Sequence, residues 1–397
     1  MEFDPFSQEF FEDPYEVYRW LREEAPVYHN EKIGFWAVSR YHDCVDVHRD
    51  VAAFTSTHGL TIDQLTSDDF RTMSQSIESM IMMDPPMHDR MRKLVSRAFT
   101  PRRIADWEPV VDEAIAEILD GLEGRDEFDV VKDFSGPFPV EVICSIVGVP
   151  KADRQQIRHW TDRLLEREVG NPFPTQAGIE AAIESAVYMQ ELVSDKRANP
   201  TDDMISHLIE AEIEREDGSV DHLTDTEIAG FISLLTAAGS ETVTKLIGNA
   251  ALIFDDNPGE LERVKADPTL TADAVEELLR YRPPSQYQGR FSLEDRSFHG
   301  VTIPAGNPVL IVTGAATRDP RAYDDPDRFD IQREGPLGIT LGHGIHYCIG
   351  AHLARLESRV AIDELYRRWP DLAVDRDGVR WVQMANVAGP ANVPVSV

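Results

Sequence analysis

The residues most able to do chemistry lie in LGHGIHYCIG, Leu341 to Gly350, which holds one cysteine, two histidines and three glycines. We expect a helix to begin near Ile349, so that its N-terminal amides point at the Cys348 sulfur and favour the thiolate. A thiolate there is a nucleophile or a metal ligand. The alternative is a small, buried and inert thiol.

The glycines of this segment favour a chemical role for the cysteine. Gly342, Gly344 and Gly350 remove side chains around the sulfur, as close approach of a bulky flat group to the backbone requires. Glycine-rich loops also bind phosphates, but this one lacks the Gly-Lys-Ser/Thr of a phosphate loop and the preceding strand of a dinucleotide-binding turn. We therefore expect a planar ligand beside Cys348.

A second candidate group lies within the longest predicted helix, residues 224–255. Thr224 and Glu227 have the spacing of a capping box at its start, and its middle is apolar on most faces, which predicts a buried helix. A membrane span is disfavoured because Glu241 and Lys245 fall near the centre, where charges are costly in lipid.

The segment AAGSET inside this helix places Gly239 beside an acid, Glu241, and an alcohol, Thr242. A helical glycine costs about 1 kcal/mol relative to alanine, so Gly239 calls for a reason. One reason is a locally widened turn that admits dioxygen, with the carboxylate and the hydroxyl delivering protons. The alternative is a polar stripe, including Ser240, that faces a water pocket.

Two charged pairs at helical spacing complete the candidates. DPPMHDRMR starts a helix at its prolines and sets His88 and Arg92 four residues apart on one face. DAVEELLRY sets Glu277 and Arg280 three residues apart, a spacing that is also common on exposed helix surfaces.

LGHGIHYCIG resembles the haem-binding loop of the cytochromes P450, whose pattern is Phe-Gly-x-Gly-x-His-x-Cys-x-Gly, and departs from it only at Leu341. Three more segments resemble motifs of that family, in the family's order: DPPMHDRMR, AAGSET and DAVEELLRY. The resemblance extends from about residue 10 to the end of the chain. It is specific because four motifs agree together.

The resemblance implies one catalytic domain over residues 1–397. Its fold would be mainly α with small β-sheets, the cytochrome P450 fold, with haem between a long central helix and the cysteine-loop helix. Cys348 would be the axial thiolate of haem b, which favours O–O cleavage. Thr242 would hold the oxygen hydrogen-bond network, Glu241 would feed it protons, and Gly239 would give access.

Further roles follow from the same resemblance. The expected haem-binding residues, besides Cys348, are His88, Arg92, Arg290, His346, Gly342 and Gly350. A buried structural network would contain Glu277, Arg280 and Arg328. The expected substrate pocket is lined by Leu234, Leu235, Ala238, Pro284, Tyr287 and Met83, of which Met83 belongs to a methionine-rich stretch that serves either the pocket or the core. Apolar lining predicts a hydrophobic substrate.

The resemblance implies insertion of one oxygen atom of O2 into a hydrophobic small molecule, as a hydroxylation or an epoxidation. A haem peroxygenase driven by peroxide is the alternative within haem chemistry. A cysteine-nucleophile hydrolase, with His346 as base beside Cys348, is an alternative from another class. A haem protein that senses without turnover is a third.

The charge of the chain and its first residues limit which partners and which cellular location we expect. The chain has 39 basic and 71 acidic residues and a net charge of −32, which disfavours nucleic acid and anionic membranes. Its start has no signal-peptide pattern, so we expect a cytoplasmic protein. We also expect a monomer. No flavin or iron–sulfur module is evident, so electrons would come from a ferredoxin or flavodoxin. A basic cluster would attract such an acidic partner: Arg90, Arg92, Lys93, Arg97, Arg102 and Arg103.

Overall fold

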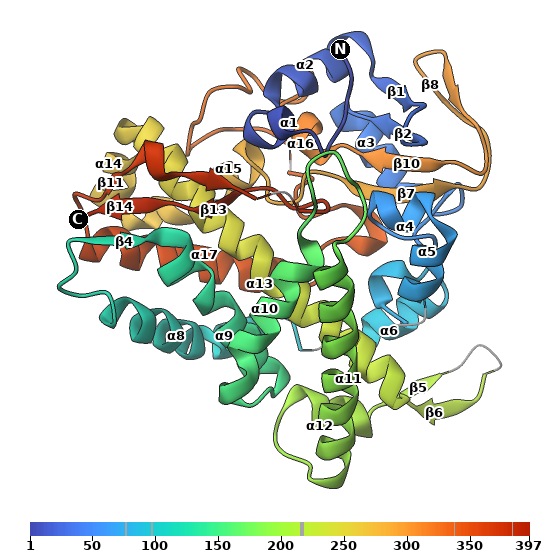
Figure 1. The fold of residues 1–397 in the computed structure, drawn as a ribbon, viewed down its shortest axis with the longest axis horizontal. Helices are drawn as coiled ribbons and strands as arrows, with labels where there is room; N and C mark the ends of the chain where they lie inside the picture. Colours follow the sequence, from blue (N-terminus) through green and yellow to red (C-terminus); the bar gives the residue numbers. More distant parts are fainter. Residues whose placement is uncertain (76–77, 97, 215–217, 337, 383) are drawn as a thin grey trace.

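The computed structural model describes residues 1–75, 78–96, 98–214, 218–336, 338–382 and 384–397. Its α-helices are α1 (Gln8–Glu12), α2 (Tyr15–Glu24), α3 (Tyr41–Arg49), α4 (Ile62–Thr66), α5 (Asp68–Gln75), α6 (Met87–Val95), α7 (Pro101–Asp106), α8 (Glu108–Asp120), α9 (Pro137–Val147), α10 (Arg154–Leu165), α11 (Gln176–Ala198), α12 (Met204–Glu210), α13 (Asp225–Asp256), α14 (Pro258–Ala266), α15 (Thr271–Tyr281), α16 (Thr313–Ala316) and α17 (Ala351–Arg368). The expectation of a mainly helical chain is confirmed (Figure 1).

The strands are short and form small sheets. They are β1 (Val27–Asn30), β2 (Phe35–Val38), β3 (Phe54–Thr55), β4 (Glu127–Asp129), β5 (Glu212–Glu214), β6 (Val220–His222), β7 (Gln288–Ser292), β8 (Arg296–Phe298), β9 (Val301–Ile303), β10 (Pro308–Ile311), β11 (Ala373–Val374), β12 (Arg380–Trp381), β13 (Pro390–Asn392) and β14 (Pro394–Ser396). The largest sheet has the order β1-β2-β10-β7-β3, and only its β2–β10 pair is parallel. Its strand β7 carries Arg290.

Helix α13 crosses the middle of the molecule (Figure 1). Its start is the predicted capping box. The Glu227 amide donates to the Thr224 hydroxyl at 3.1 Å, and the Thr224 amide donates to the Glu227 carboxylate at 2.8 Å. Most of its side chains are buried, as the sequence predicts. Among the described residues, no helix combines the length and apolar character that crossing a membrane requires.

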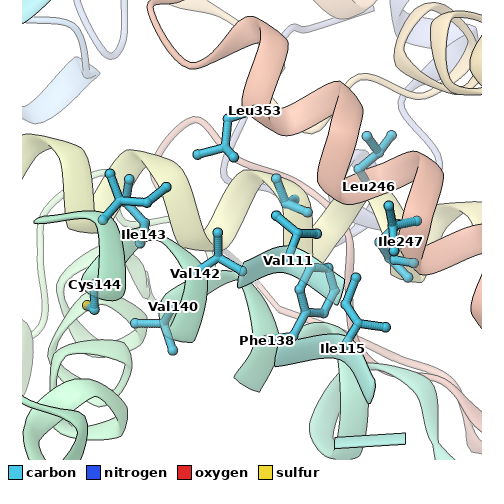
Figure 2. Packing of buried hydrophobic residues seen from close by; sticks show 14 of the residues in the cluster. Val111, Ile115, Phe138, Val140, Val142, Ile143, Cys144, Leu246, Ile247 and Leu353 are labelled. Atoms are coloured by element: carbon cyan, nitrogen blue, oxygen red, sulfur yellow. The ribbon is translucent and has the colours of Figure 1, made fainter. Parts of the chain in front are cut away.

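The main apolar core surrounds α13 (Figure 2). Val111 of α8 and Phe138 and Ile143 of α9 pack with Leu246 of α13 and Leu353 of α17, and each of these side chains is at most 4 % exposed. Burying side chains of this size contributes about 1.5–3 kcal/mol each, so the packing fixes α17 against α13. The helix that follows the cysteine loop is thereby held rigidly.

A buried ion-pair network secures α15, with one correction to the sequence prediction. Glu277 and Arg280 form a two-bond pair at 2.7 and 2.8 Å, and both are buried. The third member is Arg333, whose Nε lies 3.1 Å from Glu277 Oε1. Arg328 was the wrong choice: its side chain is 64 % exposed and pairs with Asp330. Only the Arg328 carbonyl joins the network, by accepting from Arg280 and Arg333.

Candidate active site

The cysteine loop folds back on itself before α17 begins. Gly342 and Gly344 have φ of +76° and +68°, a region that glycine occupies without strain. The Cys348 amide donates to the Leu341 carbonyl at 2.8 Å, which closes the loop. A Cβ on Gly344 would lie 2.8 Å from the His48 carbonyl, whereas one on Gly350 would meet only the Cys348 sulfur, at 4.0 Å. Gly350 therefore keeps the space beside the sulfur open.

The surroundings of Cys348 stabilise its thiolate less than the sequence predicts. Helix α17 begins at Ala351, two residues later than predicted. Burial raises the pKa of the Cys348 thiol, and a hydrogen bond from the Gly350 amide and the nearby charges of Arg92 and Arg355 oppose this rise without cancelling it. A free thiol is therefore favoured in the protein alone, and coordination to a metal would deprotonate it.

Four predicted basic residues converge beside the cysteine loop. The rings of His88 and His346 lie 4.4 Å apart, and an Arg92 guanidinium nitrogen donates to the Tyr347 carbonyl at 2.5 Å. Arg290 is 3 % exposed, and burial lowers its pKa to about 10. Burial lowers the pKa of His346 far below its usual range, and Arg290, His88 and Arg92 reinforce this shift. Helix α6, strand β7 and the loop thus bring together groups far apart in sequence.

The four basic residues beside the cysteine loop fit the carboxylates of a haem. Nε2 of His88 is buried without a hydrogen-bond partner among the described residues, as are both ring nitrogens of His48. Buried polar groups are normally hydrogen-bonded, so these donors call for an acceptor. The sequence prediction missed His48 of α3, whose pKa is lowered to about 3 by burial and by the nearby Arg290 and His343. No motif in the sequence marks it.

The AAGSET segment exposes one strip of an otherwise buried helix. Ala238 is exposed and Gly239 and Thr242 are half-buried, while Ser240 and Glu241 are buried. The Thr242 hydroxyl donates to the Ala238 carbonyl at 3.0 Å. Thr242 is therefore the hydroxyl-bearing residue of this strip.

Gly239 has a structural reason that differs from the predicted one. The segment is continuous α-helix, without a widened turn. A Cβ on Gly239 would lie 3.0 Å from Cγ1 of Ile143 and 3.4 Å from its Cβ. The glycine therefore permits close packing of α13 against α9, and the oxygen-access role assigned to it is not supported.

Glu241 faces away from this strip, toward α10. Lys245 Nζ lies 2.8 Å from its Oε1, and Asp162 of α10 lines the same cleft as Glu241. Burial raises the pKa of Glu241 to about 7, against the opposing charge of Lys245 and with a contribution from Asp162. Sequence reasoning missed Asp162, because its partner is remote in the chain.

The predicted pocket residues do not all lie together. Leu235 is buried in the main core and Leu234 and Met83 are half-buried against it. Pro284 is buried, and its carbonyl accepts from the Ala388 amide. Tyr287 belongs to a separate apolar cluster around the N-terminal helices, and its hydroxyl donates to the Ala385 carbonyl at 2.7 Å. Tyr287 therefore packs in a different cluster from Leu234, Leu235 and Met83, and its place in the substrate pocket stays a prediction.

A thiol in a glycine-rich loop, basic side chains that suit two carboxylates and a hydroxyl-bearing strip on a central helix define the class of haem-thiolate enzymes. The family model of cytochrome P450 matches residues 14–267 and 265–370. The chain belongs to the cytochrome P450 family.

Similar proteins cover nearly the whole chain. A putative cytochrome P450 123 of Mycobacterium tuberculosis is 43 % identical over 99 % of this chain and 96 % of its own. The vitamin D(3) 25-hydroxylase of Pseudonocardia autotrophica is 36 % identical over 99 % and 96 %. The solved structure of the cytochrome P450 PksS of the Bacillus subtilis bacillaene polyketide synthase has a TM-score of 0.88 and 33 % identity, covering 100 % and 99 %.

Family membership establishes the reaction class and the cofactor. The protein is a monooxygenase that binds haem through a cysteine thiolate, and it acts on a small molecule with O2 and a redox partner. Haem iron takes its equatorial ligands from the porphyrin, so one protein thiolate suffices. The described residues contain no group of three or more histidine, cysteine, aspartate or glutamate side chains placed to hold a metal.

Proposed function

We propose that this enzyme inserts one oxygen atom of O2 into a C–H or C=C bond of a hydrophobic small molecule, with Cys348 as the haem ligand and electrons from a separate ferredoxin or flavodoxin. The convergence of His88, Arg92, Arg290 and His346 beside the cysteine loop carries this assignment of the site. The vitamin D(3) and polyketide enzymes named above support an apolar substrate of moderate size.

Bound haem supplies the binding and activation of O2. The chain's own residues would hold and prepare it. Arg92, Arg290 and the two histidines would donate charge-assisted hydrogen bonds to its carboxylates, which fixes its orientation. The Thr242 hydroxyl, on the exposed strip of α13, would act as a proton donor. Glu241, on the other side of the helix, would return a proton to Thr242.

The structure disfavours the hydrolase alternative. His346 Nε2 is 3.1 Å from the Ser56 hydroxyl, and its ring packs against His88. Its strongly lowered pKa makes it a poor general base near neutral pH. A cysteine hydrolase would therefore have a base that is already engaged and too weakly basic.

The reaction is tested by supplying 18O2, NADH, a ferredoxin and its reductase with a panel of apolar substrates. Steroids, fatty acids and macrolide precursors are suitable members of the panel, chosen by the spectral shift that they cause in the ferric protein. One labelled oxygen atom in the product is expected. Product formed only when hydrogen peroxide replaces the electron donors would instead establish the peroxygenase alternative.

Positive side chains near the cysteine loop should attract the electron donor. Lys93, Arg102 and Arg103 are exposed, whereas Arg97 lies outside the described residues. We expect the double variant Lys93→Glu/Arg102→Glu to lower the rate of reduction by an acidic ferredoxin at least tenfold at low salt, because electrostatic steering changes association rates by 10–10³. Stopped-flow reduction measures this.

The difference should shrink at high ionic strength, since salt screens exposed charges. Exposed Lys32 and Arg125, which lie outside the basic cluster, provide the matched control Lys32→Glu/Arg125→Glu. Equal losses in the two double variants would show that net charge, not this surface, governs reduction.

A further inference from the structure

A histidine in the last turn of α3 is buried without a partner. His48 is 2 % exposed, and neither of its ring nitrogens has a hydrogen-bond partner among the described residues. Both nitrogens of an imidazole are polar in every protonation state, so two bonds are missing. Such a side chain calls for a partner that the rest of the chain does not supply.

The packing of the backbone fixes His48 against the cysteine loop. Helix α3 contacts η5, the short helical turn over Gly344–His346. A Cβ on Gly344 would lie 2.8 Å from the His48 carbonyl oxygen, so the glycine lets the two backbones meet. In the next residue, Arg49, Nη2 lies 3.2 Å from Nε2 of His343. The last turn of α3 is therefore held directly on the loop that carries Cys348.

The same helix lies beside the strand that neighbours Arg290. Helix α3 packs against β10, and Val47 of α3 shares an apolar cluster with Val309 of β10. Val309 is the register partner of Arg290 on β7. The cysteine loop and the β10–β7 pair thus place His48 close to Arg290. The lowering of the His48 pKa by the charge of Arg290 agrees with this placement.

Arg290 shows what kind of partner this region needs. Its side chain is buried, it forms no ion pair with any residue that the structure describes, and it donates to the Gly289 carbonyl at 2.7 Å. A guanidinium has five N–H donors, so further donors remain. A buried charge normally has an opposite charge beside it, so a buried guanidinium next to an orphaned imidazole favours an anionic acceptor over water alone.

We propose that His48 is an additional haem-binding residue, which donates a hydrogen bond to a carboxylate of the bound haem and so helps to set its retention and its reduction potential. The inference rests on the proposed function, because it takes Arg290 and His346 as haem partners. It adds a residue from α3 to groups supplied by α6, β7 and the cysteine loop.

The chemistry of the side chain suits a donor of this kind. Burial, reinforced by Arg290 and His343, lowers the pKa of His48 to about 3, so the ring stays neutral near pH 7. A neutral imidazole has one N–H donor and one acceptor nitrogen. Its N–H can bond to a carboxylate without placing a second full charge beside Arg290. A hydrogen bond to a carboxylate disperses negative charge, which favours the ferrous over the ferric haem.

The first test measures how fast the holoenzyme loses haem to an excess of apomyoglobin. We expect His48→Leu to lose haem about tenfold faster than the wild type, because hydrogen bonds to charged groups are among the stronger ones. Leucine keeps an apolar side chain in the core but has no N–H. His42, which is exposed on the same helix, gives the matched control His42→Leu, and its rate should equal that of the wild type.

A modified cofactor shows whether the lost bond is the one to the carboxylate. Wild type and His48→Leu are each reconstituted with haem dimethyl ester, whose carboxylates are esterified and uncharged. The ester should be lost at nearly the same rate from both proteins, since the proposed acceptor is already gone. This comparison is a double-mutant cycle between the side chain and the carboxylate. A structural role for His48 would instead accelerate the loss of both cofactors equally.

The midpoint potential gives a second readout. His48→Leu should have a lower potential than the wild type with ordinary haem and an unchanged one with the dimethyl ester. His48→Gln keeps an N–H donor and should recover part of the potential and of the haem retention. It also takes the place of His48→Leu in both measurements if the leucine variant does not fold, with intermediate values expected for ordinary haem.

The two proposals fail in different ways. If the wild type binds no haem or gives no thiolate band with carbon monoxide, the proposed function fails. If the wild type gives that band while His48→Leu and His48→Gln match His42→Leu in retention and potential, His48 does not bind haem and the proposed function stands. Equal acceleration with ordinary haem and its ester would also overturn the inference.

Discussion

Replacing Cys348 with alanine should abolish the carbon monoxide band characteristic of thiolate-ligated haem, and monooxygenase activity should fall to background. The reason is that Cys348 is the only cysteine in the glycine-rich loop, while Cys44 and Cys144 are buried elsewhere, Cys144 in the main core. The measurement is the difference spectrum of the reduced protein with carbon monoxide, taken alongside product formation.

Cys144→Ala is the matched control. Burial raises the pKa of the Cys144 thiol to about 12, so this cysteine is an inert core residue. The control should keep the thiolate band and lose only the stability expected from a small cavity. A thiolate band that persists in Cys348→Ala would refute Cys348 as the ligand, and its loss in Cys144→Ala would move the ligand to α9.

Breaking the ion-pair network around Glu277 should have the largest effect on stability. Glu277→Gln leaves Arg280 and Arg333 buried without their shared carboxylate. Removing one partner of a buried ion pair costs about 3–5 kcal/mol because the remaining charge stays uncompensated. We expect a loss of that size in the free energy of unfolding, measured from urea midpoints of the holoenzyme with a common m value.

Two arginine variants test which residue completes the network. Arg333→Gln should cost about 3 kcal/mol, close to the effect of Glu277→Gln, because its side chain is only 9 % exposed and bonds to several groups. Arg328→Gln should change stability by less than about 0.5 kcal/mol, as exposed substitutions usually do. The reverse ranking would restore the sequence assignment of Arg328.

The network shows a limit of sequence reasoning. Glu277 and Arg280 could be assigned because both lie on α15, where a spacing of three residues guarantees proximity. Arg328 and Arg333 both follow in an irregular segment, and no periodicity indicates which one turns inward. Tyr287 shows the same limit: its position along the chain is clear, but the cluster into which its ring packs depends on the N-terminal helices.

The sequence by itself determined the family and the cysteine loop. It also determined the start of the long helix, from its capping box, and the placement of His88 and Arg92 on one helix face. Each of these features depends on residues that are close together in the chain. Only the tertiary structure decided that Gly239 serves packing against Ile143, that His48 lies near Arg290 and His343, and that Asp162 and Glu241 line one cleft. The physical reason is that burial and long-range contact, not local propensity, set the protonation and partners of these groups.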